Sequence, residues 1–187
     1  MPTTTTAPFD QHKFDELVLH VAELSSDDVT FGKTKLNKIM YYVDFYAYGV
    51  TGKSITGATY QRRQFGPVPK QIAAARQRLV ASGRVRFDEI SYFGRPLERM
   101  TPLEGADVSA FTLGELQLIS EVVRGLRDLN GSQASEMSHQ EVGWILAADG
   151  ETIPYETVFL NAPALTTEDI ARGREIESEL ERRLVAA

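Results

Sequence analysis

The sequence has 187 residues, of which 42% are hydrophobic and 25% charged, the composition of a soluble globular protein. No apolar run approaches the about 18 residues that a membrane-spanning helix needs, and the first residues lack the basic and apolar regions of a signal peptide. The absence of cysteine excludes disulfides, thiolate zinc sites and cysteine nucleophiles. We therefore expect a cytoplasmic protein with no membrane partner.

The net charge of −6 conceals a division along the chain. The stretch from Lys33 to Met100 has 13 Lys and Arg against 4 Asp and Glu, whereas the rest has 7 basic and 22 acidic residues. Such a stretch is typical of a nucleic-acid interface, but it is equally expected where an acidic segment folds over a basic one. Both interpretations stay open, because a sequence gives the order of charges and not their position on a surface.

Two helices are expected in the first quarter of the chain. Residues 1–8 are rich in Thr and Pro and are predicted to be a disordered tail. Asp10 can cap a helix over residues 11–24. The strongest helical period follows over residues 34–48, where Gly49 is expected to end the helix in left-handed geometry. The apolar face of this second helix comprises Leu36, Ile39, Met40, Val43, Tyr46 and Ala47, while Lys33, Lys35, Lys38 and Asp44 fall mostly off it.

The middle of the chain is predicted to be mixed. Residues 58–65 favour an extended segment, and the prolines of Phe65-Gly66-Pro67-Val68-Pro69 favour a bend. A third helix is expected from Pro69 to Ala81, because proline is tolerated at a helix start. The β-rich runs 85–92 and 97–103 predict a β-hairpin. A helix followed by such a hairpin is compatible with a winged-helix nucleic-acid binder, or the hairpin simply caps a helical core.

The last third is predicted to be helical again. Thr112-Leu113-Gly114-Glu115 has the spacing of a capping box, and a helix is expected from there to a stop at Asn130-Gly131. One or two short helices are predicted over residues 132–148, and Pro154 prevents a continuous helix after them. The elements together predict an α+β fold that is predominantly helical, with a compact helical core and a small antiparallel β-hairpin or sheet. We expect one domain over residues 9–160 and a C-terminal surface helix within residues 161–187, from about Thr167 to Val185.

The residues that carry chemistry do not form a recognisable active site. The three histidines have no metal-ligand spacing. Gly32-Lys33-Thr34 resembles the end of a phosphate-binding loop, but Asp27 stands where that motif requires its first glycine. Ser138 beside His139 is a neighbourhood in sequence and not a catalytic triad. We therefore expect no enzyme, no cofactor and no metal, and a structural or partner-facing role for His139.

Three separated stretches resemble the SocA-like Panacea antitoxin domain, a phage-associated protein family. The first is Thr34-Lys35-Leu36-Asn37-Lys38-Ile39-Met40-Tyr41-Tyr42, with its leucine, lysines and paired aromatics. The second is Phe65-Gly66-Pro67-Val68, and the third is Met137-Ser138-His139-Gln140-Glu141 with Trp144 close behind. Their order and spacing agree with the family, and together they cover roughly residues 30 to 160.

The resemblance implies a non-enzymatic antitoxin that neutralises a toxin encoded by an adjacent gene through direct protein–protein binding. In some members of the family the antitoxin is also a proteolytic adaptor that delivers the toxin to a cytoplasmic protease. The alternative function is a winged-helix-like nucleic-acid-binding regulator, which the overall acidity opposes. Homo-oligomerisation stays open.

Tyr41, Tyr42, Arg62 and Arg63 are the candidate toxin contacts, because interface cores favour Tyr and Arg. Tyr41 and Tyr42 extend the apolar face of the second helix sideways, so we expect them at the boundary between core and surface.

Overall fold

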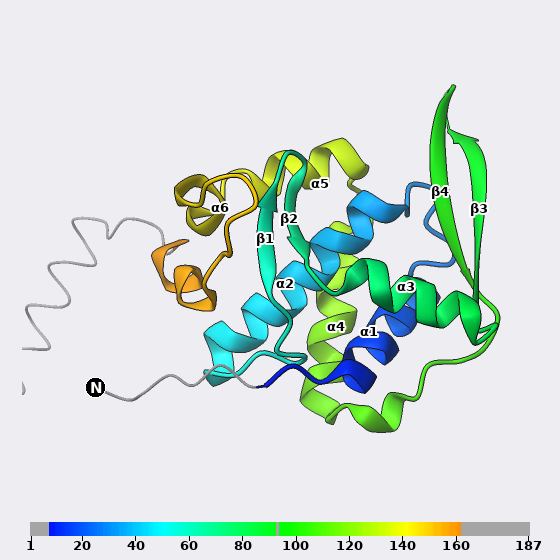
Figure 1. The fold of residues 1–187 in the computed structure, drawn as a ribbon, viewed down its shortest axis with the longest axis horizontal. Coiled ribbons are helices and arrows are strands. Elements are labelled where there is room, and N and C mark those ends of the chain that lie inside the picture. Colours follow the sequence, from blue (N-terminus) through cyan, green and yellow to red (C-terminus); the bar gives the residue numbers. More distant parts are fainter. Residues whose placement is uncertain (1–7, 93, 162–187) are drawn as a thin grey trace, which may run out of the picture.

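The computed structural model describes residues 8–92 and 94–161, which form an α+β fold that is mostly helical (Figure 1). The predicted fold class is confirmed, with two separate antiparallel two-stranded sheets. The predicted tail, apart from Pro8, and the predicted C-terminal helix lie outside the described residues. In chain order the elements are α1 (Gln11–Leu24), α2 (Lys33–Thr51), β1 (Tyr60–Arg63), β2 (Gly66–Pro69), α3 (Ile72–Ala81), β3 (Val85–Tyr92), β4 (Arg95–Pro102), the 3-10 helix η1 (Val108–Ala110), α4 (Leu113–Leu126), α5 (Gly131–Ser138), α6 (Val142–Leu146) and the 3-10 helix η2 (Tyr155–Asn161).

Helix α2 lies at the centre of the fold, where α1, α4, α5, η2 and strands of both sheets contact it. Because neighbours surround the helix, its polar positions are buried as well. Lys35, Lys38 and Asp44 are each no more than 1% exposed, so the expectation that they lie off the buried side is wrong. Asp44 is accommodated because it accepts hydrogen bonds from Thr56 Oγ1 at 2.6 Å and from Tyr60 Oη at 2.7 Å.

Some helix ends lie where the sequence predicts them, whereas the stops of α2 and α4 do not: α4 ends at Leu126, and Asn130 instead caps the start of α5. Asp10 accepts a hydrogen bond from Lys13 N at 2.9 Å, and the predicted bounds of α1 are confirmed. The predicted capping box at Thr112 and Glu115 is confirmed too. Helix α2, however, continues past Gly49 and ends at Gly52, which has a φ of 74°. The predicted stop was one turn too early.

The two sheets are both hairpins, and only the second was predicted as one. Strands β3 and β4 pair in antiparallel register from Val85 opposite Pro102 to Tyr92 opposite Arg95. In the first hairpin, residues 66–69 form β2 and pair with β1, so the predicted bend is confined to the turn that precedes Gly66. Because these residues are committed to a strand, α3 begins at Ile72 instead of Pro69.

One hydrophobic cluster joins the elements, and α1 contributes a large share of it. Within the described ranges, no helix is long and apolar enough to cross a membrane. The α1 side chains with no exposed surface are Phe14, Leu17, Val18, Leu19, Val21 and Ala22.

Candidate functional site

The three stretches that resemble the antitoxin family meet at the β1–β2 turn. Ser135 Oγ on α5 donates a hydrogen bond to the Phe65 carbonyl at 3.0 Å. Trp144 Nε1 on α6 donates to the Arg63 carbonyl at 3.1 Å, and Lys38 Nζ on α2 donates to the Pro67 carbonyl at 3.3 Å. We call this meeting point of α2, α5 and α6 with residues 63–67 the motif junction. The three stretches, which are far apart in the sequence, are therefore neighbours in the fold.

Gly66 is the closest point of the motif junction. Its φ of 100° lies in a region that L side chains rarely adopt. A Cβ at this position would also stand 2.2 Å from Ser138 Oγ and 2.5 Å from Lys38 Cε. Both the backbone conformation and the lack of space therefore require glycine.

Lys38 is a buried cation in the motif junction. In the described part of the chain it forms no ion pair, and burial lowers its pKa from 10.5 to about 7. Burial and the nearby Lys38 charge also lower the pKa of His139. An amine near a serine hydroxyl resembles a Ser-Lys nucleophile pair, but Ser138 is fully buried and its hydroxyl donates to the Ser135 carbonyl at 2.8 Å. This arrangement holds the turn and leaves no room for a substrate.

Lys35, the other lysine of the first motif, joins α2 to the end of α4. Its ammonium forms an ion pair with Asp28 and donates to the Arg127 carbonyl at 2.8 Å. Burial opposes the charge of Asp28, but the hydrogen bonds from Lys35 and Thr30 outweigh it and lower the pKa of that carboxyl. Leu36 beside it is 2% exposed and belongs to the core. These motif residues stabilise the fold.

A stack of three side chains covers the outer side of the junction. The rings of His139 and Trp144 lie 4.1 Å apart with an interplanar angle of 20°, and the Arg62 guanidinium lies 4.2 Å from the Trp144 ring centre. Arg62 also donates to the Ala147 carbonyl at 2.6 Å. The guanidinium of Arg62, one of the candidate contacts, thus binds other residues of the same chain, whereas Arg63 is exposed.

Tyr41 and Tyr42 are buried, each 1% exposed. Tyr60 from β1 packs edge-on against Tyr41 with ring centres 5.7 Å apart, and Glu141 lies beside the Tyr42 hydroxyl. Burial raises the pKa of both tyrosines. The expectation that they lie at the boundary between core and surface is wrong, because β1 and the start of α6 cover them. In this conformation neither side chain can contact a toxin.

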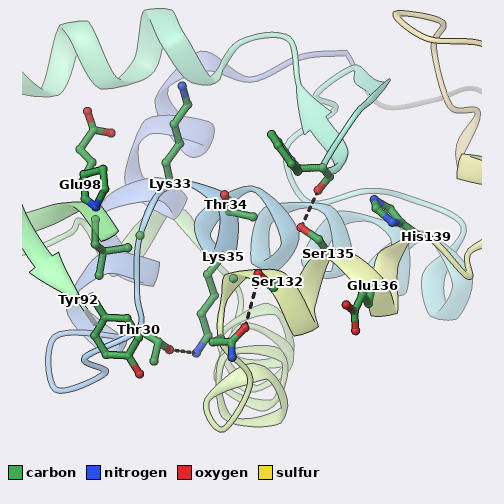
Figure 2. Close-up of a pocket in the computed structure, with 16 residues that line it drawn as sticks. Thr30, Lys33, Thr34, Lys35, Tyr92, Glu98, Ser132, Ser135, Glu136 and His139 are labelled. Carbon is green, nitrogen blue, oxygen red and sulfur yellow. Dashed lines mark hydrogen bonds between the residues drawn. The ribbon is translucent and has the colours of Figure 1, made fainter. Parts of the chain in front are cut away.

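A groove of about 850 Å³ opens beside the junction, between α5, the start of α2 and the β3–β4 hairpin (Figure 2). Phe65 from the β1–β2 turn lines it and is 62% exposed. Ser132 and Glu136 on α5 and His139, which follows its last residue, also line the groove and are labelled in Figure 2. Phe65 is not among the candidate residues predicted from the sequence, although an aromatic residue in a turn next to Gly-Pro was an available signal. The other lining residues are Thr30, Gly32, Lys33, Thr34, Lys35, Tyr92, Pro96, Leu97, Glu98, Asn130, Gly131 and Ser135.

The division of charge along the chain is compensated in part by ion pairs among the described residues. Arg78 pairs with Asp15 at 2.7 Å and Arg84 with Glu16 at 2.5 Å, so cations of the basic stretch meet the acidic face of α1. Arg76 pairs with Glu98 within the stretch itself. These pairs favour internal compensation over a nucleic-acid interface. Among the described side chains, the cations of the stretch with neither an ion pair nor a stacking contact include Lys33 on α2, Arg63 on β1, and Lys53 and Lys70 in the segments between elements.

The described residues contain no group of three His, Asp or Glu side chains placed to hold a metal ion. The site is therefore a turn held by three helices, with an exposed aromatic residue and an open groove beside it, in a helical α+β domain.

One known protein family has a model that matches most of this region of the chain. The family model described as Antitoxin SocA-like, Panacea domain, matches residues 36–145, from the first turns of α2 to α6. The chain belongs to this family, which confirms the resemblance. No curated protein and no solved structure matches the chain. Helix α1 precedes the matched region, although it shares the core with it.

Proposed function

We propose that this chain is the antitoxin of a toxin–antitoxin pair and neutralises its cognate toxin by direct binding. Membership of the antitoxin family implies such a toxin. The observation that carries the proposal is the motif junction, where all three family motifs hold one turn in place and leave Phe65 exposed. An exposed aromatic residue on a turn held by hydrogen bonds from neighbouring helices is a favourable contact, because little conformational entropy is lost on binding.

The proposed toxin contact is the tip of the β1–β2 hairpin together with the groove beside it. Arg63 and Phe65 are both exposed there, and Arg and aromatic residues are enriched in interface cores. Arg62 supports the surface from behind through its stack with Trp144. This location replaces Tyr41 and Tyr42 of the sequence-based expectation with residues that a partner can reach.

The experiment is growth rescue. The adjacent gene is expressed with and without this chain, and then with the variants Phe65→Ser and Val50→Ser. Val50 is 82% exposed on α2, so Val50→Ser is a matched control that also replaces an exposed apolar side chain. We expect wild type and Val50→Ser to restore growth, and Phe65→Ser to weaken toxin binding by at least about tenfold, the value of one well-packed contact.

Two outcomes contradict different parts of the proposal. A harmless neighbour, or a toxic one that the chain does not rescue, contradicts the antitoxin function. Equal rescue and equal binding by Phe65→Ser, with unchanged thermal stability, contradicts only the proposed surface.

We also propose a test that separates inhibition from delivery to a protease. The half-life of the toxin is measured after protein synthesis is stopped, in cells with and without this chain. A shorter half-life in the presence of the chain supports the adaptor role. An unchanged half-life together with restored growth supports inhibition by binding alone.

A further inference from the structure

The edges of the two hairpins are not equally protected. A strand edge exposes a row of backbone N–H and C=O groups, and proteins normally cover or interrupt it. The outer edge of β1 is covered by residues 150–153, since Arg62 N donates to the Glu151 carbonyl and Ile153 N donates to the Tyr60 carbonyl. The outer edge of β2 contains Pro67 and Pro69, which have no N–H, and packs against α2 and α5.

In the second hairpin, only one of the two strands is protected. Strand β4 has Pro96 and Pro102 near its ends and packs against α1 and α2. Strand β3 contains no proline over its eight residues and lies at the outer margin of the molecule in Figure 1. Over residues 85–91, no backbone hydrogen bond joins the outer side of β3 to another part of the described chain.

The pairing with β4 fixes which groups of β3 face outward. In an antiparallel ladder, successive residues alternate between bonding to the partner strand and pointing away from it. Leu103 N donates to the Arg84 carbonyl at 2.8 Å, which places Arg84 in a bonded pair. The N–H and C=O groups of the odd-numbered residues Val85, Phe87 and Glu89 therefore point away from β4.

The side chains of β3 are self-complementary about Phe87. Arg86 and Asp88 are on the same face of the strand, where they form an ion pair at 2.9 Å within each copy, and their side chains remain 60% and 39% exposed. If a second β3 pairs antiparallel with Phe87 opposite Phe87, Arg86 of each copy faces Asp88 of the other. Centring the pairing on Arg86 or on Asp88 instead would place like charges opposite each other, which is destabilising.

The register about Phe87 also satisfies the backbone. It places the outward groups of Phe87 opposite those of the second Phe87, and those of Val85 opposite Glu89. Beside the edge, α3 and β3 enclose an apolar groove of about 430 Å³ lined by Ala73, Arg76, Gln77, Val80, Ala81 and Phe87. Val80 is 47% exposed there, so an apolar surface adjoins the free edge.

We propose that a second copy of this chain pairs with the free edge of β3, in antiparallel register centred on Phe87. The two hairpins then form one four-stranded sheet with two-fold symmetry, in which each copy presents the same surface to the other. This interface lies on β3 and α3, and it does not depend on the proposed toxin contact.

The test is the mass of the protein in solution, measured by light scattering on a sizing column and by sedimentation at micromolar concentrations. Wild type should have the mass of two chains. Arg86→Asp and Asp88→Arg should each be monomeric alone, with a dissociation constant raised at least tenfold, because each opposes like charges across the two-fold axis. A mixture of the two variants should form a heterodimer, since every opposed pair is then of opposite charge.

The mixture separates an interface effect from a folding defect, because misfolded chains are not restored by mixing. Glu121→Arg on the exposed side of α4 is the control for a change of charge and should leave the dimer intact. A wild-type monomer overturns the proposal. So does a dimer that persists unchanged in both single variants, or a mixture of folded variants that stays monomeric.

Discussion

Lys38 carries a basic side chain in a buried position, where its charged form is disfavoured. It is buried, it forms no ion pair in the described part of the chain, and its ammonium donates to one backbone carbonyl at a long distance of 3.3 Å. Its aliphatic part fills the space against Gly66, so the side chain is held by packing as much as by hydrogen bonding. Burial of this charged side chain in the family motif therefore costs electrostatic free energy.

The stability of the protein should consequently depend on pH through Lys38. Burial lowers the pKa of Lys38 from 10.5 to about 7, so between these values the unfolded chain binds a proton that the folded chain does not. The contribution of Lys38 to the free energy of unfolding therefore rises with pH between about 7 and 10.5, and this gain is absent below pH 7. From pH 7 to pH 9, wild type should gain about 2 kcal/mol relative to Lys38→Met.

The measurement is urea denaturation of both proteins at several pH values. It stays at or below pH 9, because the buried tyrosines resist ionisation in the folded state and stability falls once they ionise in the unfolded chain. A constant difference between the two proteins would show that Lys38 is not desolvated as described.

Gly66 provides a second test at this scale. Gly66→Ala should reduce the free energy of unfolding by about 2 to 5 kcal/mol, because it combines left-handed strain with a clash against Ser138. Gly83→Ala is the matched control: its φ of 74° gives similar strain, but nothing lies within 4 Å of the added methyl group. Its loss should be about 1 kcal/mol. Equal losses in the two variants would contradict the close packing of the motif junction.

At the scale of elements, α2 organises the domain because other elements bury 13 of its 19 residues. Ile39→Ala should destabilise the fold by about 2 to 5 kcal/mol, the usual cost of truncating a buried aliphatic side chain. Val50→Ala on the exposed end of the same helix should change stability by less than about 0.5 kcal/mol. Chemical denaturation of both variants decides this, and a loss below about half a kcal/mol for Ile39→Ala would mean that the buried face is misplaced.

Local patterns predicted the elements that depend on neighbouring residues. The bounds of α1, the capping box of α4 and the β3–β4 hairpin all follow from short-range spacing, and the structure confirms them. The end of α2 was missed because Gly52, and not Gly49, adopts the left-handed conformation, whereas Gly49 stays helical with Val158 3.4 Å from the position that its Cβ would occupy. A glycine in a sequence does not reveal whether it serves a turn or a contact.

Only part of the site was predicted, because contacts between distant segments do not follow from local spacing. The three motifs were identified, but periodicity along one helix could not show that Tyr60 and Glu141 cover Tyr41 and Tyr42. Nor could it show that Phe65 remains outside while Gly66 next to it is buried. Burial at a junction of distant segments is decided by the tertiary fold, and local propensity carries little information about it.

At the scale of the whole molecule, ion pairs among the described residues join part of the basic stretch to acidic residues of α1: Arg78 on α3 pairs with Asp15, and Arg84 just before β3 pairs with Glu16. The two partner surfaces that we propose are local: the tip of the β1–β2 hairpin with its groove for the toxin, and the edge of β3 for a second copy. These two surfaces belong to different hairpins, so toxin binding and self-association are expected to be separable by mutation.

The most direct test of the central claim is a binding measurement with purified proteins. The product of the adjacent gene, made in an inactive form if it is toxic to the host, is titrated with this chain by calorimetry and then passed over a sizing column. A saturable complex that Phe65→Ser weakens and Val50→Ser does not is the predicted result. An adjacent product that impairs growth when active, yet forms no complex with the folded wild-type chain, would contradict neutralisation by direct binding.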